Sequence, residues 1–353
     1  MRKVLSVVGT RPNLMKTAPV IAALGRRGID QVLVHTGQHY DASMSDVFFD
    51  DLAMPEPNHF LDVGSGTHAQ QTARVMERLE PILVAEQPDA VLVPGDVNST
   101  LAAALVAAKL EIPVGHIEAG LRSFDWTMPE ELNRVVTDAV SDLLFIHSPE
   151  ARDNLLREGR PEASIHYVGN TMIDSLVAIR DRLDSRKRGG HLVVTLHRPA
   201  LVDGPLLANA MDALREVADH MPVVFPVHPR TRTALDARGI EAPGAIEPVG
   251  YLEFLRLVAS AAAVLTDSGG IQEETTFLGI PCFTLRDNTE RPITVEMGTN
   301  VLLGLRPERI AELPQLIATA GSGAASIPPL WDGAAGERVA DVLVSQSLIR
   351  RRS

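Results

Sequence analysis

Short apolar runs alternate with amphipathic segments along the chain. In its first half the pattern predicts strands at 3–8, 31–36, 90–93, 113–117, 143–147 and 165–168, with helices at 18–27, 68–86 and 99–109. Strands that alternate with helices in this way are typical of βαβ units, which build a parallel sheet. We therefore predict a doubly wound α/β fold for this half.

The alternation is interrupted once and then restarts. Charged residues dominate 180–188, and Gly189 and Gly190 follow. We interpret this stretch as a domain junction, although its basic residues would also suit the solvated end of a helix. Beyond it the pattern predicts strands at 191–196, 223–227, 262–266, 282–285 and 301–303, with helices at 206–219 and 251–259.

The expected organisation is therefore two Rossmann-like domains that face each other across a central cleft. The first is expected to span 1–172 and the second 190–335. A final helix within 336–353 is expected to pack back on the first domain. Ligand pockets often form at such domain interfaces.

Composition narrows the classes of function. The chain has 353 residues, of which 45% are hydrophobic, so two domains can each bury a core. Its net charge of -12 argues against general nucleic-acid binding, which needs a basic surface. No stretch approaches the roughly 20 apolar residues of a membrane span, and no cleavage site follows the apolar start, so we expect a soluble, cytoplasmic protein.

Neither a disulfide nor a metal is indicated. Cys282 is the only cysteine, and its apolar neighbours favour a buried structural role. The Cys/His spacings of zinc sites and the Gly-x-Ser-x-Gly nucleophile elbow are both missing, so we expect no metal and no cofactor.

A glycine turn with two cations follows the first predicted strand. The sequence from Gly9 reads Gly-Thr-Arg-Pro-Asn-Leu-Met-Lys and leads into a helix, so Arg11 and Lys16 lie near a helix N-terminus. Helix N-termini favour anions, and guanidinium groups bind phosphate oxygens in pairs. A phosphate site is one interpretation, and a capped turn with exposed charges is the other.

Two carboxylates follow the ends of later strands. Asp96 comes after the strand at 90–93, and Glu118 after the strand at 113–117. Because the carboxyl ends of parallel strands form the ligand crevice, both are candidates for general acid–base work. As alternatives, Asp96 could cap the helix that starts near Ser99, and Glu118 could pair with Arg122.

Further candidates lie at a helix start and after the first strand of the second half. Pro129 suits the first helical position, which places Glu130, Glu131 and Arg134 in the opening turns. Acids in a first turn also stabilise a helix without any other role. His197 ends a strand and can titrate near neutral pH, although a satisfied structural histidine is the simpler interpretation.

A second glycine turn resembles a phosphate cradle. Ser268, Gly269 and Gly270 lie between a strand and a helix, where backbone amides can approach a phosphate closely. Glu274 lies one turn further, where it could accept both hydroxyl groups of a ribose. Arg291 is another candidate phosphate contact. A simple helix cap is the alternative.

In this order, the motifs resemble the non-hydrolysing UDP-N-acetylglucosamine 2-epimerases over nearly the whole chain. The matching segments are 9–16, Gln38-His39, Gly95-Asp96, 116–122, 129–134, His197-Arg198, 226–229 and 267–274. The resemblance implies a glycosyltransferase-B-like architecture and the interconversion of UDP-GlcNAc and UDP-ManNAc. It also implies a homodimer that acts on a UDP-sugar. From the charge and the hydropathy given above, we expect no nucleic-acid and no membrane partner.

The implied route removes the proton at C2 of the sugar and expels UDP to give a 2-acetamidoglucal. UDP then adds back while a proton is delivered to the opposite face. By motif, the catalytic set would be Asp96, Glu118, Glu130 and His197. The UDP contacts would be Arg11, Lys16, Arg134, Ser268, Gly269, Gly270, Glu274 and Arg291.

The chain departs from the family pattern in two places. Asn13 stands where many members have Glu, and Pro199-Ala200-Leu201 follow His197-Arg198 where many members continue Arg-Glu-Asn. In members regulated by UDP-GlcNAc at a second site, Arg and Gln stand at the positions of Pro199 and Asp41. Four other positions of that site still match: Gln38, Arg74, Glu131 and His228. We expect activation by a second substrate molecule to be weakened or absent.

Three alternatives stay open at the level of sequence. A hydrolysing epimerase would share the elimination step but release UDP and free ManNAc. A glycosyltransferase of the same architecture would need fewer carboxylates in its first domain. A non-catalytic nucleotide-sugar-binding protein would gain nothing from acids beside a pyrophosphate. The pathway, in envelope polysaccharide or in secondary metabolism, is not encoded in these motifs.

Overall fold

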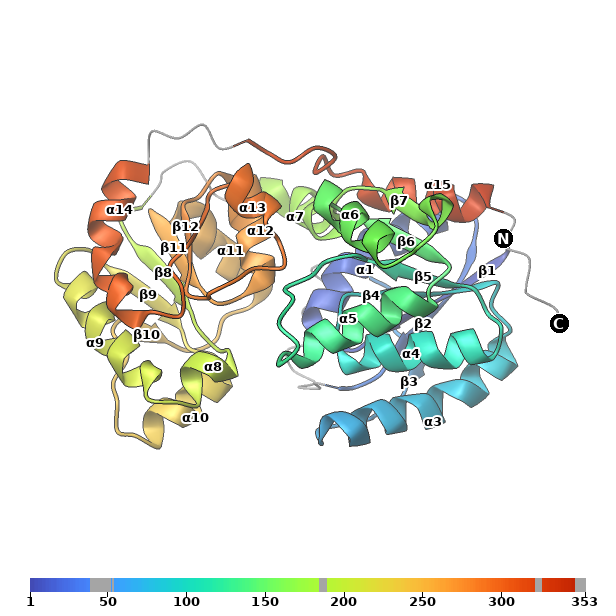
Figure 1. The fold of residues 1–353 in the computed structure, drawn as a ribbon, viewed down its shortest axis with the longest axis horizontal. Coiled ribbons are helices and arrows are strands. Elements are labelled where there is room, and N and C mark those ends of the chain that lie inside the picture. Colours follow the sequence, from blue (N-terminus) through green and yellow to red (C-terminus); the bar gives the residue numbers. More distant parts are fainter. Residues whose placement is uncertain (39–51, 53, 184–188, 321–325, 347–353) are drawn as a thin grey trace. The chain divides into compact units, whose positions relative to one another are not determined.

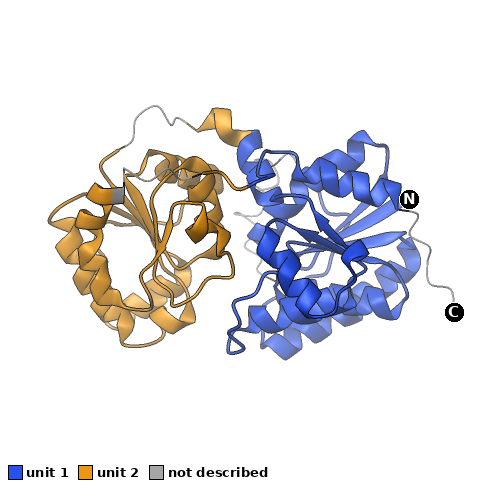
Figure 2. Ribbon diagram, turned by 45° about the horizontal axis from the view of Figure 1, so that its top comes forward, with its two compact units in different colours: residues 1–178, 329–353 blue, residues 179–328 orange. Residues whose placement is uncertain are grey.

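The computed structural model describes residues 1–38, 52, 54–183, 189–320 and 326–346. The chain divides into two compact units, Met1–Ala178 with Pro329–Ser353, and Ile179–Pro328 (Figure 2). The second unit begins at Ile179, between the expected end of the first domain at 172 and the expected start of the second at 190. The chain belongs to the first unit again from Pro329, earlier than the expected residue 336. Within the charged stretch, 184–188 lie outside the described residues.

The first unit is built on a seven-stranded parallel sheet of order β3-β2-β1-β4-β5-β6-β7. Its strands are β1 (Lys3–Val8), β2 (Asp30–His35), β3 (His59–Phe60), β4 (Ala90–Pro94), β5 (Val114–Ile117), β6 (Leu143–Ile146) and β7 (Ile165–Tyr167). Leu5 of β1 pairs with Val32 on one side and Val91 on the other, so the strand order reverses at β1. Ligands bind beyond the carboxyl ends of the strands at such a reversal.

The helices of this unit are α1 (Arg11–Arg26), α3 (His68–Glu86), α4 (Asn98–Lys109), α5 (Pro129–Val140), α6 (Pro149–Arg157), α7 (Thr171–Ile179) and α15 (Ala335–Ser345), with a 3-10 turn at Glu162–Ser164. The prediction that the first helix starts at residue 18 was wrong, because α1 begins at Arg11. Asn13 makes this early start by accepting hydrogen bonds from the backbone N–H of Gly9 (3.0 Å) and Thr10 (3.2 Å). Pro12 suits the first turn, where its missing N–H costs nothing.

The C-terminal helix α15 packs on α1, although the two are far apart in sequence (Figure 1). Val339, Ala340 and Leu343 share a core with Val20 and Leu24. Glu337 adds ion pairs to Arg26 in the last turn of α1 and, at 2.5 Å, to the C-cap residue Arg27. Apolar burial of this kind stabilises by about 25 cal/mol per Å², so α15 is an integral part of the first unit.

The second unit repeats the same plan with a six-stranded parallel sheet of order β10-β9-β8-β11-β12-β13. Its strands are β8 (Leu192–Thr195), β9 (Val223–Pro226), β10 (Ala245–Ile246), β11 (Ala263–Thr266), β12 (Cys282–Thr284) and β13 (Asn300–Leu302). Its helices are α8 (Pro199–Val202), α9 (Leu206–Ala218), α10 (Pro229–Asp236), α11 (Tyr251–Ser260), α12 (Gly269–Leu278), α13 (Ile293–Glu296) and α14 (Leu313–Ala320), with 3-10 turns at Arg180–Arg182 and Pro307–Glu312. The predicted pair of Rossmann-like domains is confirmed.

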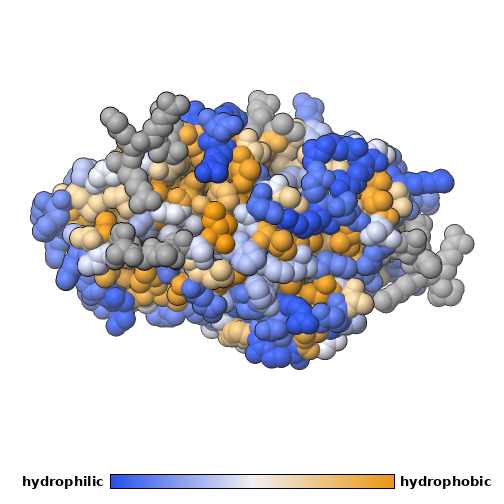
Figure 3. Space-filling view, turned by 90° about the horizontal axis from the view of Figure 1, so that it is seen from above, coloured by the Kyte–Doolittle hydropathy of each residue, from blue (hydrophilic) through white to orange (hydrophobic). Residues whose placement is uncertain are grey.

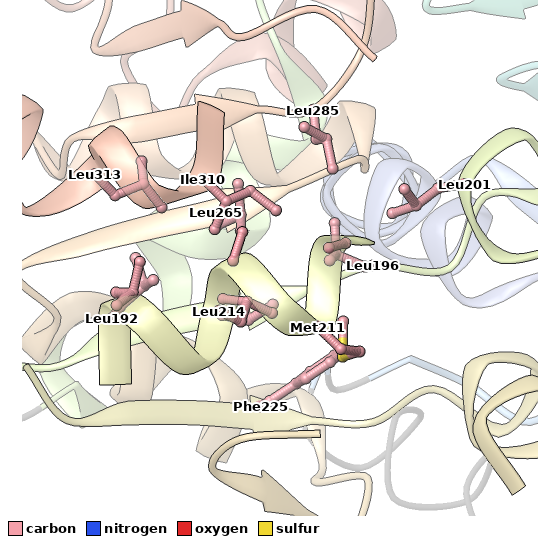
Figure 4. Close-up of a cluster of buried hydrophobic side chains, with 14 of the residues drawn as sticks. Leu192, Leu196, Leu201, Met211, Leu214, Phe225, Leu265, Leu285, Ile310 and Leu313 are labelled. Atoms are coloured by element: carbon pink, nitrogen blue, oxygen red, sulfur yellow. The ribbon is translucent and has the colours of Figure 1, made fainter. Parts of the chain in front are cut away.

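One buried core cluster of the second unit lies between α9 and the sheet. Met211 and Leu214 of α9 belong to the same buried cluster as Leu192, Leu265 and Phe225 from three neighbouring strands (Figure 4). On the face drawn in Figure 3, hydrophobic residues lie in small groups between hydrophilic ones. Among the described residues, no helix has both the length and the apolar character needed to cross a membrane.

Candidate active site

Two of the predicted catalytic carboxylates lie beyond the ends of neighbouring strands. Asp96 follows β4 and Glu118 follows β5, and these strands pair in parallel. A backbone hydrogen bond from Gly95 to Ile117 (2.9 Å) continues the ladder up to the two acids. They therefore lie on the edge of the sheet that binds ligands in this fold.

Glu118 forms a buried ion pair with Lys16 of α1. The side chains of Lys16 and Glu118 are 8% and 6% exposed. Gly95 lies next to this ion pair, and its φ is +68°. A Cβ atom at Gly95 would approach Lys16 Nζ to 3.1 Å. Glycine is needed at this turn because only glycine adopts that φ freely. The alternative partner Arg122 is used elsewhere, by Asp138 (2.7 Å) and Glu158 (2.6 Å).

Glu118 itself has left-handed backbone geometry, with a φ of +69°. Such conformations are uncommon outside glycine and cost free energy, and they persist where the surrounding structure enforces them. The backbone N–H groups of Glu118 and Ala119 both donate to the Phe145 carbonyl at 3.0 Å. The sheet edge thus fixes where the Glu118 carboxylate points.

A buried network of hydrogen bonds holds the turns after β4 and β5 in place. His116 Nδ1 lies 2.7 Å from Asp138 Oδ1, and Nε2 lies 2.7 Å from the Gly95 carbonyl. The other Asp138 oxygen accepts from the Gly120 N–H at 3.0 Å. Burial alone would raise the pKa of Asp138, but the charges and hydrogen bonds of His116 and Arg122 lower it below its usual value. Asp138 therefore stays ionised and ties α5 to the turns that carry Asp96 and Glu118.

Asp96 pairs with Arg134 of α5. Arg134 Nη2 lies 2.7 Å from Asp96 Oδ2, and Asn133 donates to the Asp96 carbonyl at 2.9 Å. The alternative role of Asp96 as a helix cap is not found, because Val97 occupies the N-cap position of α4. Glu130, in the first turn of α5, is partly exposed. The structure thus brings Lys16, Asp96, Glu118 and Arg134 to one edge of the first unit.

In the second unit, His197 is oriented by Asp267. Its Nδ1 lies 3.0 Å from Asp267 Oδ1, while Asp267 Oδ2 accepts from the backbone N–H of His197 (2.8 Å) and Arg198 (2.7 Å). Burial would raise the pKa of Asp267, but His197 and these backbone donors lower it overall. An ionised Asp267 fixes Nδ1–H and leaves Nε2 of the ring for other contacts.

The second glycine turn starts α12 beyond the end of β11. Ser268 is the N-cap residue, and the buried Gly269 and the partly exposed Gly270 follow. Arg291 lies behind the turn, where a Cβ at Gly269 would collide with its guanidinium. Arg291 also pairs with Glu290 (2.6 Å) and Glu273 (3.1 Å). Its guanidinium group therefore lies beside the N-terminus of α12, within a buried network of ion pairs.

Glu274 lies one turn further into α12 and is fully enclosed. The Tyr251 hydroxyl donates to Glu274 Oε1 at 2.8 Å. Burial raises the pKa of Glu274 to about 8, although the Tyr251 hydrogen bond offsets part of the shift. This carboxyl is therefore poised to change protonation near neutral pH.

The remaining regulatory candidates are engaged in local hydrogen bonds. Gln38 accepts from the Ser99 hydroxyl at 2.7 Å, and Arg74 donates to the Val63 carbonyl at 3.1 Å. Glu131 holds the backbone N–H groups of Ser123 (2.9 Å) and Phe124 (2.8 Å). His228, in the second unit, accepts from Arg230 N and lies 5.3 Å from the His197 ring. Asp41, a departure from the regulated pattern, lies outside the described residues.

Sequence reasoning missed three buried groups that contact the candidate residues. Asp138 and Tyr251 orient His116 and Glu274, and His147 Nε2 lies 4.0 Å from Glu118 Oε1. Asp138 could have been found as an acid on the buried side of α5, four residues after Arg134. His147 directly follows the buried strand β6 beside β5, a signal of the kind that identified Glu118.

The family profile described as UDP-N-acetylglucosamine 2-epimerase matches residues 22–344. The chain belongs to this family. A UDP-N-acetylglucosamine 2-epimerase of Methanocaldococcus jannaschii is 41% identical over 97% of this chain and 98% of its own length. A UDP-2,3-diacetamido-2,3-dideoxy-D-glucuronate 2-epimerase of Pseudomonas aeruginosa is 45% identical over 88% of this chain and 90% of its own.

Solved structures of the epimerase family agree with both sheets described above. The crystal structure of the M. jannaschii UDP-GlcNAc 2-epimerase in complex with UDP-GlcNAc and UDP matches with a TM-score of 0.89. It is 41% identical, and the match covers 98% of this chain and 100% of that one. The glycosyltransferase-B-like, α/β fold class predicted from the motifs is therefore confirmed.

Proposed function

We propose that this protein reversibly epimerises UDP-GlcNAc to UDP-ManNAc without net hydrolysis. A base removes the proton from C2, the electron pair forms the C1–C2 double bond, and the C1–O bond to UDP breaks. UDP then adds back at C1 while C2 is protonated from the opposite face. The proton and the UDP lost in the first step are restored in the second, so the route as written consumes no other reactant.

The observation that carries the proposal is the pair of carboxylates at the ends of β4 and β5. Glu118 lies beside Lys16, and Asp96 lies beside Arg134 at 2.7 Å. A cation next to each acid favours the ionised form that can accept a proton. With Glu130 and His197 they form the proposed catalytic set, and we leave open which carboxylate takes the C2 proton.

Retention of UDP between elimination and re-addition needs a cradle for the diphosphate. We assign it to Ser268, Gly269 and Gly270 at the start of α12, since helix N-termini bind anions. Arg291, whose guanidinium lies beside Gly269 in an ion-pair network with Glu290 and Glu273, is a further proposed contact. Arg11, Lys16 and Arg134 complete the proposed phosphate contacts, and Glu274 the ribose contact. Aided by Asp267, His197 would stabilise charge on the leaving diphosphate.

The P. aeruginosa relative favours a second candidate substrate. Its printed activity concerns a sugar with acetamido groups at C2 and C3 and a carboxylate at C6, and its identity of 45% is similar to that of the GlcNAc epimerases. The shared feature is a UDP-linked 2-acetamido sugar that is inverted at C2. The proposed acid–base groups serve either substrate equally, because both react at the same carbon.

The proposal also includes a cytoplasmic homodimer, as the family resemblance implies. The net charge of -12 supports a small-molecule substrate over nucleic acid. Sedimentation of the pure protein at two concentrations measures the assembly state. A monomer at both would contradict that part of the proposal alone.

Product analysis tests the proposed activity and separates it from the alternatives. The pure protein is given UDP-GlcNAc or UDP-2,3-diacetamido-2,3-dideoxyglucuronate, and kcat/KM is measured for each. We expect the 2-epimeric UDP-sugar as the product, with the higher kcat/KM for UDP-GlcNAc. Free ManNAc with stoichiometric UDP would identify a hydrolysing enzyme. A higher kcat/KM for the uronate would select the second candidate.

A further inference from the structure

The Tyr251–Glu274 pair belongs to the second unit and has no catalytic task in the proposal above. Tyr251 is the first residue of α11 and is buried, and its hydroxyl donates to Glu274 Oε1 at 2.8 Å. Burial and the nearby carboxylate raise the pKa of Tyr251 well above its usual value, so the hydroxyl remains a donor throughout the working range. One oxygen of Glu274 is thereby fixed.

The other oxygen of Glu274 has no hydrogen-bond partner among the residues that the structure describes. Glu274 is 1% exposed, and its Oε2 is buried without a donor from those residues. A buried polar atom without a partner destabilises the fold, so a purely structural carboxylate would not be expected to keep one oxygen unpaired. Glutamine would fill the same space without a titratable charge. The arrangement is that of a receptor for a ligand donor.

The position of Glu274 in α12 indicates which part of a bound nucleotide it would contact. Helix α12 begins at the Ser268–Gly270 turn, and Glu274 lies within its next turn, on the same short helix. If the turn holds the diphosphate, the part of a nucleotide within reach of Glu274 is the sugar next to the phosphates. A ribose offers two adjacent hydroxyl donors there.

We propose that Tyr251 is the positioning residue that sets the specificity of this site for ribonucleotides: it occupies Oε1 and so presents Oε2 of Glu274 to the ribose hydroxyls. This inference rests on the proposed function, because it takes UDP as the ligand of the Ser268–Gly270 turn. Tyr251 acts through Glu274 and not on the reacting carbon. Its loss should therefore weaken nucleotide binding while kcat at saturating substrate is kept.

Ribose recognition at this pair should also depend on pH. Ribose hydroxyls donate more strongly to the ionised than to the neutral carboxyl group, so binding favours the ionised form. Because the pKa of Glu274 is raised to about 8, the preference for ribose should grow as pH rises from 6 to 9. The other charged group that acts on Glu274 is Glu273 on the same helix, which Arg291 pairs at 3.1 Å. Tyr251 is the titratable contact from α11.

The test compares binding of UDP and 2′,3′-dideoxy-UDP by titration calorimetry. Their phosphates are identical, so the ratio of the two Kd values isolates the ribose hydroxyls at every pH. In the wild type we expect UDP to bind at least about tenfold more tightly at pH 8, with a smaller ratio at pH 6. Tyr251→Phe should bring the ratio close to one and raise KM. Tyr167→Phe is the matched control, since it removes a hydroxyl that donates to the Pro329 carbonyl at 2.9 Å in the other unit.

The outcomes separate the inference from the function on which it rests. UDP binding with a Kd ratio that is independent of pH in the wild type, or unchanged in Tyr251→Phe, overturns the role of Tyr251 and leaves the epimerase proposal standing. Failure of the wild type to bind UDP at all overturns both. Because the pH series uses the wild type, the inference is tested even if Tyr251→Phe does not fold. Loss of kcat rather than of affinity in a folded Tyr251→Phe also overturns it.

Discussion

Lys16 and Glu118 form an ion pair in which both side chains are more than nine-tenths buried. Such pairs add little net stability, because desolvation of two charges offsets their attraction. Their retention therefore indicates a role other than stability. The pair joins α1, to which the proposed function assigns phosphate contacts, to Glu118 after the end of β5, which is one of the proposed acid–base groups.

Substitution of Lys16 should lower both the stability and the activity of the protein. Lys16→Met leaves the Glu118 carboxylate buried without its partner, and we expect a loss of about 3–5 kcal/mol in unfolding free energy together with most of the activity. In Lys16→Met/Glu118→Leu, stability should largely return while activity stays absent. Urea denaturation and initial rates measure the two effects.

Arg152 provides the matched control for this prediction. It pairs with Glu162 at 2.9 Å, and both side chains are about half exposed. Breaking such a surface pair costs about 0–1 kcal/mol. If Lys16→Met were no more harmful to stability than Arg152→Met, the buried pair would not have the importance assigned to it.

Asp267→Asn should remove the group that orients His197 while the histidine itself stays in place. Asn cannot supply the charge that orients His197 Nδ1, so we expect kcat to fall by at least about 100-fold. Asp203→Asn, which removes an exposed partner of Arg230 in the same unit, should leave kcat unchanged. A wild-type kcat in folded Asp267→Asn would exclude His197 from the catalytic set.

The same variant has a predicted effect on acid stability. The pKa of Asp267 is lower in the folded than in the unfolded protein, so the stability it contributes is complete above the unfolded value and is lost as pH falls through the folded one. The difference in unfolding free energy between the wild type and Asp267→Asn should therefore shrink below about pH 4. A difference that is constant from pH 7 to pH 3 would contradict the assignment.

Asp174 should have the opposite pH dependence. Burial raises its pKa from 3.8 to about 6, although it accepts the Gly336 N–H at the start of α15 at 2.7 Å. The folded state then holds its proton more tightly than the unfolded state, so stability is complete below about pH 4 and falls as pH rises to 6. The loss should reach at most about 3 kcal/mol and disappear in Asp174→Asn. Denaturation curves at pH 4, 5, 6 and 7 measure it.

Asp332 is a suitable comparison for Asp174. Its pKa is lowered, chiefly by its hydrogen bonds with Arg338, so Asp332→Asn should change the pH dependence in the other direction and only weakly, since the group is largely exposed. A wild-type stability that increases between pH 4 and 6 and keeps that slope in Asp174→Asn would refute the Asp174 assignment.

Activation by a second substrate molecule should be weak or missing. Pro199, where regulated members have an arginine, starts α8 and offers no cationic side chain. Gln38, Arg74 and Glu131 are committed to local hydrogen bonds. We expect rates with UDP-ManNAc alone to follow a hyperbola. A sigmoidal curve that becomes hyperbolic on addition of UDP-GlcNAc would show that regulation survives.

The strands could be predicted from the sequence more accurately than the residues that contact the candidate site residues. Buried parallel strands are continuous apolar runs, so β1, β4 and β5 could be placed from local pattern alone, together with the acids that follow β4 and β5. The start of α1 could not, because it depends on the Asn13 side chain, which holds the Gly9–Thr10 turn and donates to Pro94 on another strand at 3.0 Å. Helix propensity does not contain that contact.

Ion-pair partners were also beyond the reach of local pattern. The alternative considered for Glu118 was a pair with Arg122, four residues away, yet Glu118 pairs with Lys16, more than a hundred residues earlier. Tyr251 and Asp138 were missed for the same reason, since each acts on a residue brought near only by the sheet order. Local spacing identifies which groups lie at a strand end, and tertiary packing decides what they contact.

The most direct test of the epimerase proposal follows C2 of the sugar in heavy water. The pure protein is incubated with UDP-GlcNAc in deuterium oxide, and proton NMR monitors the H2 signals. Proton abstraction and return predict UDP-ManNAc and UDP-GlcNAc that both carry deuterium at C2, with free ManNAc at trace level. Conversion to UDP-ManNAc with the original proton kept at C2 would contradict the proposed elimination and re-addition.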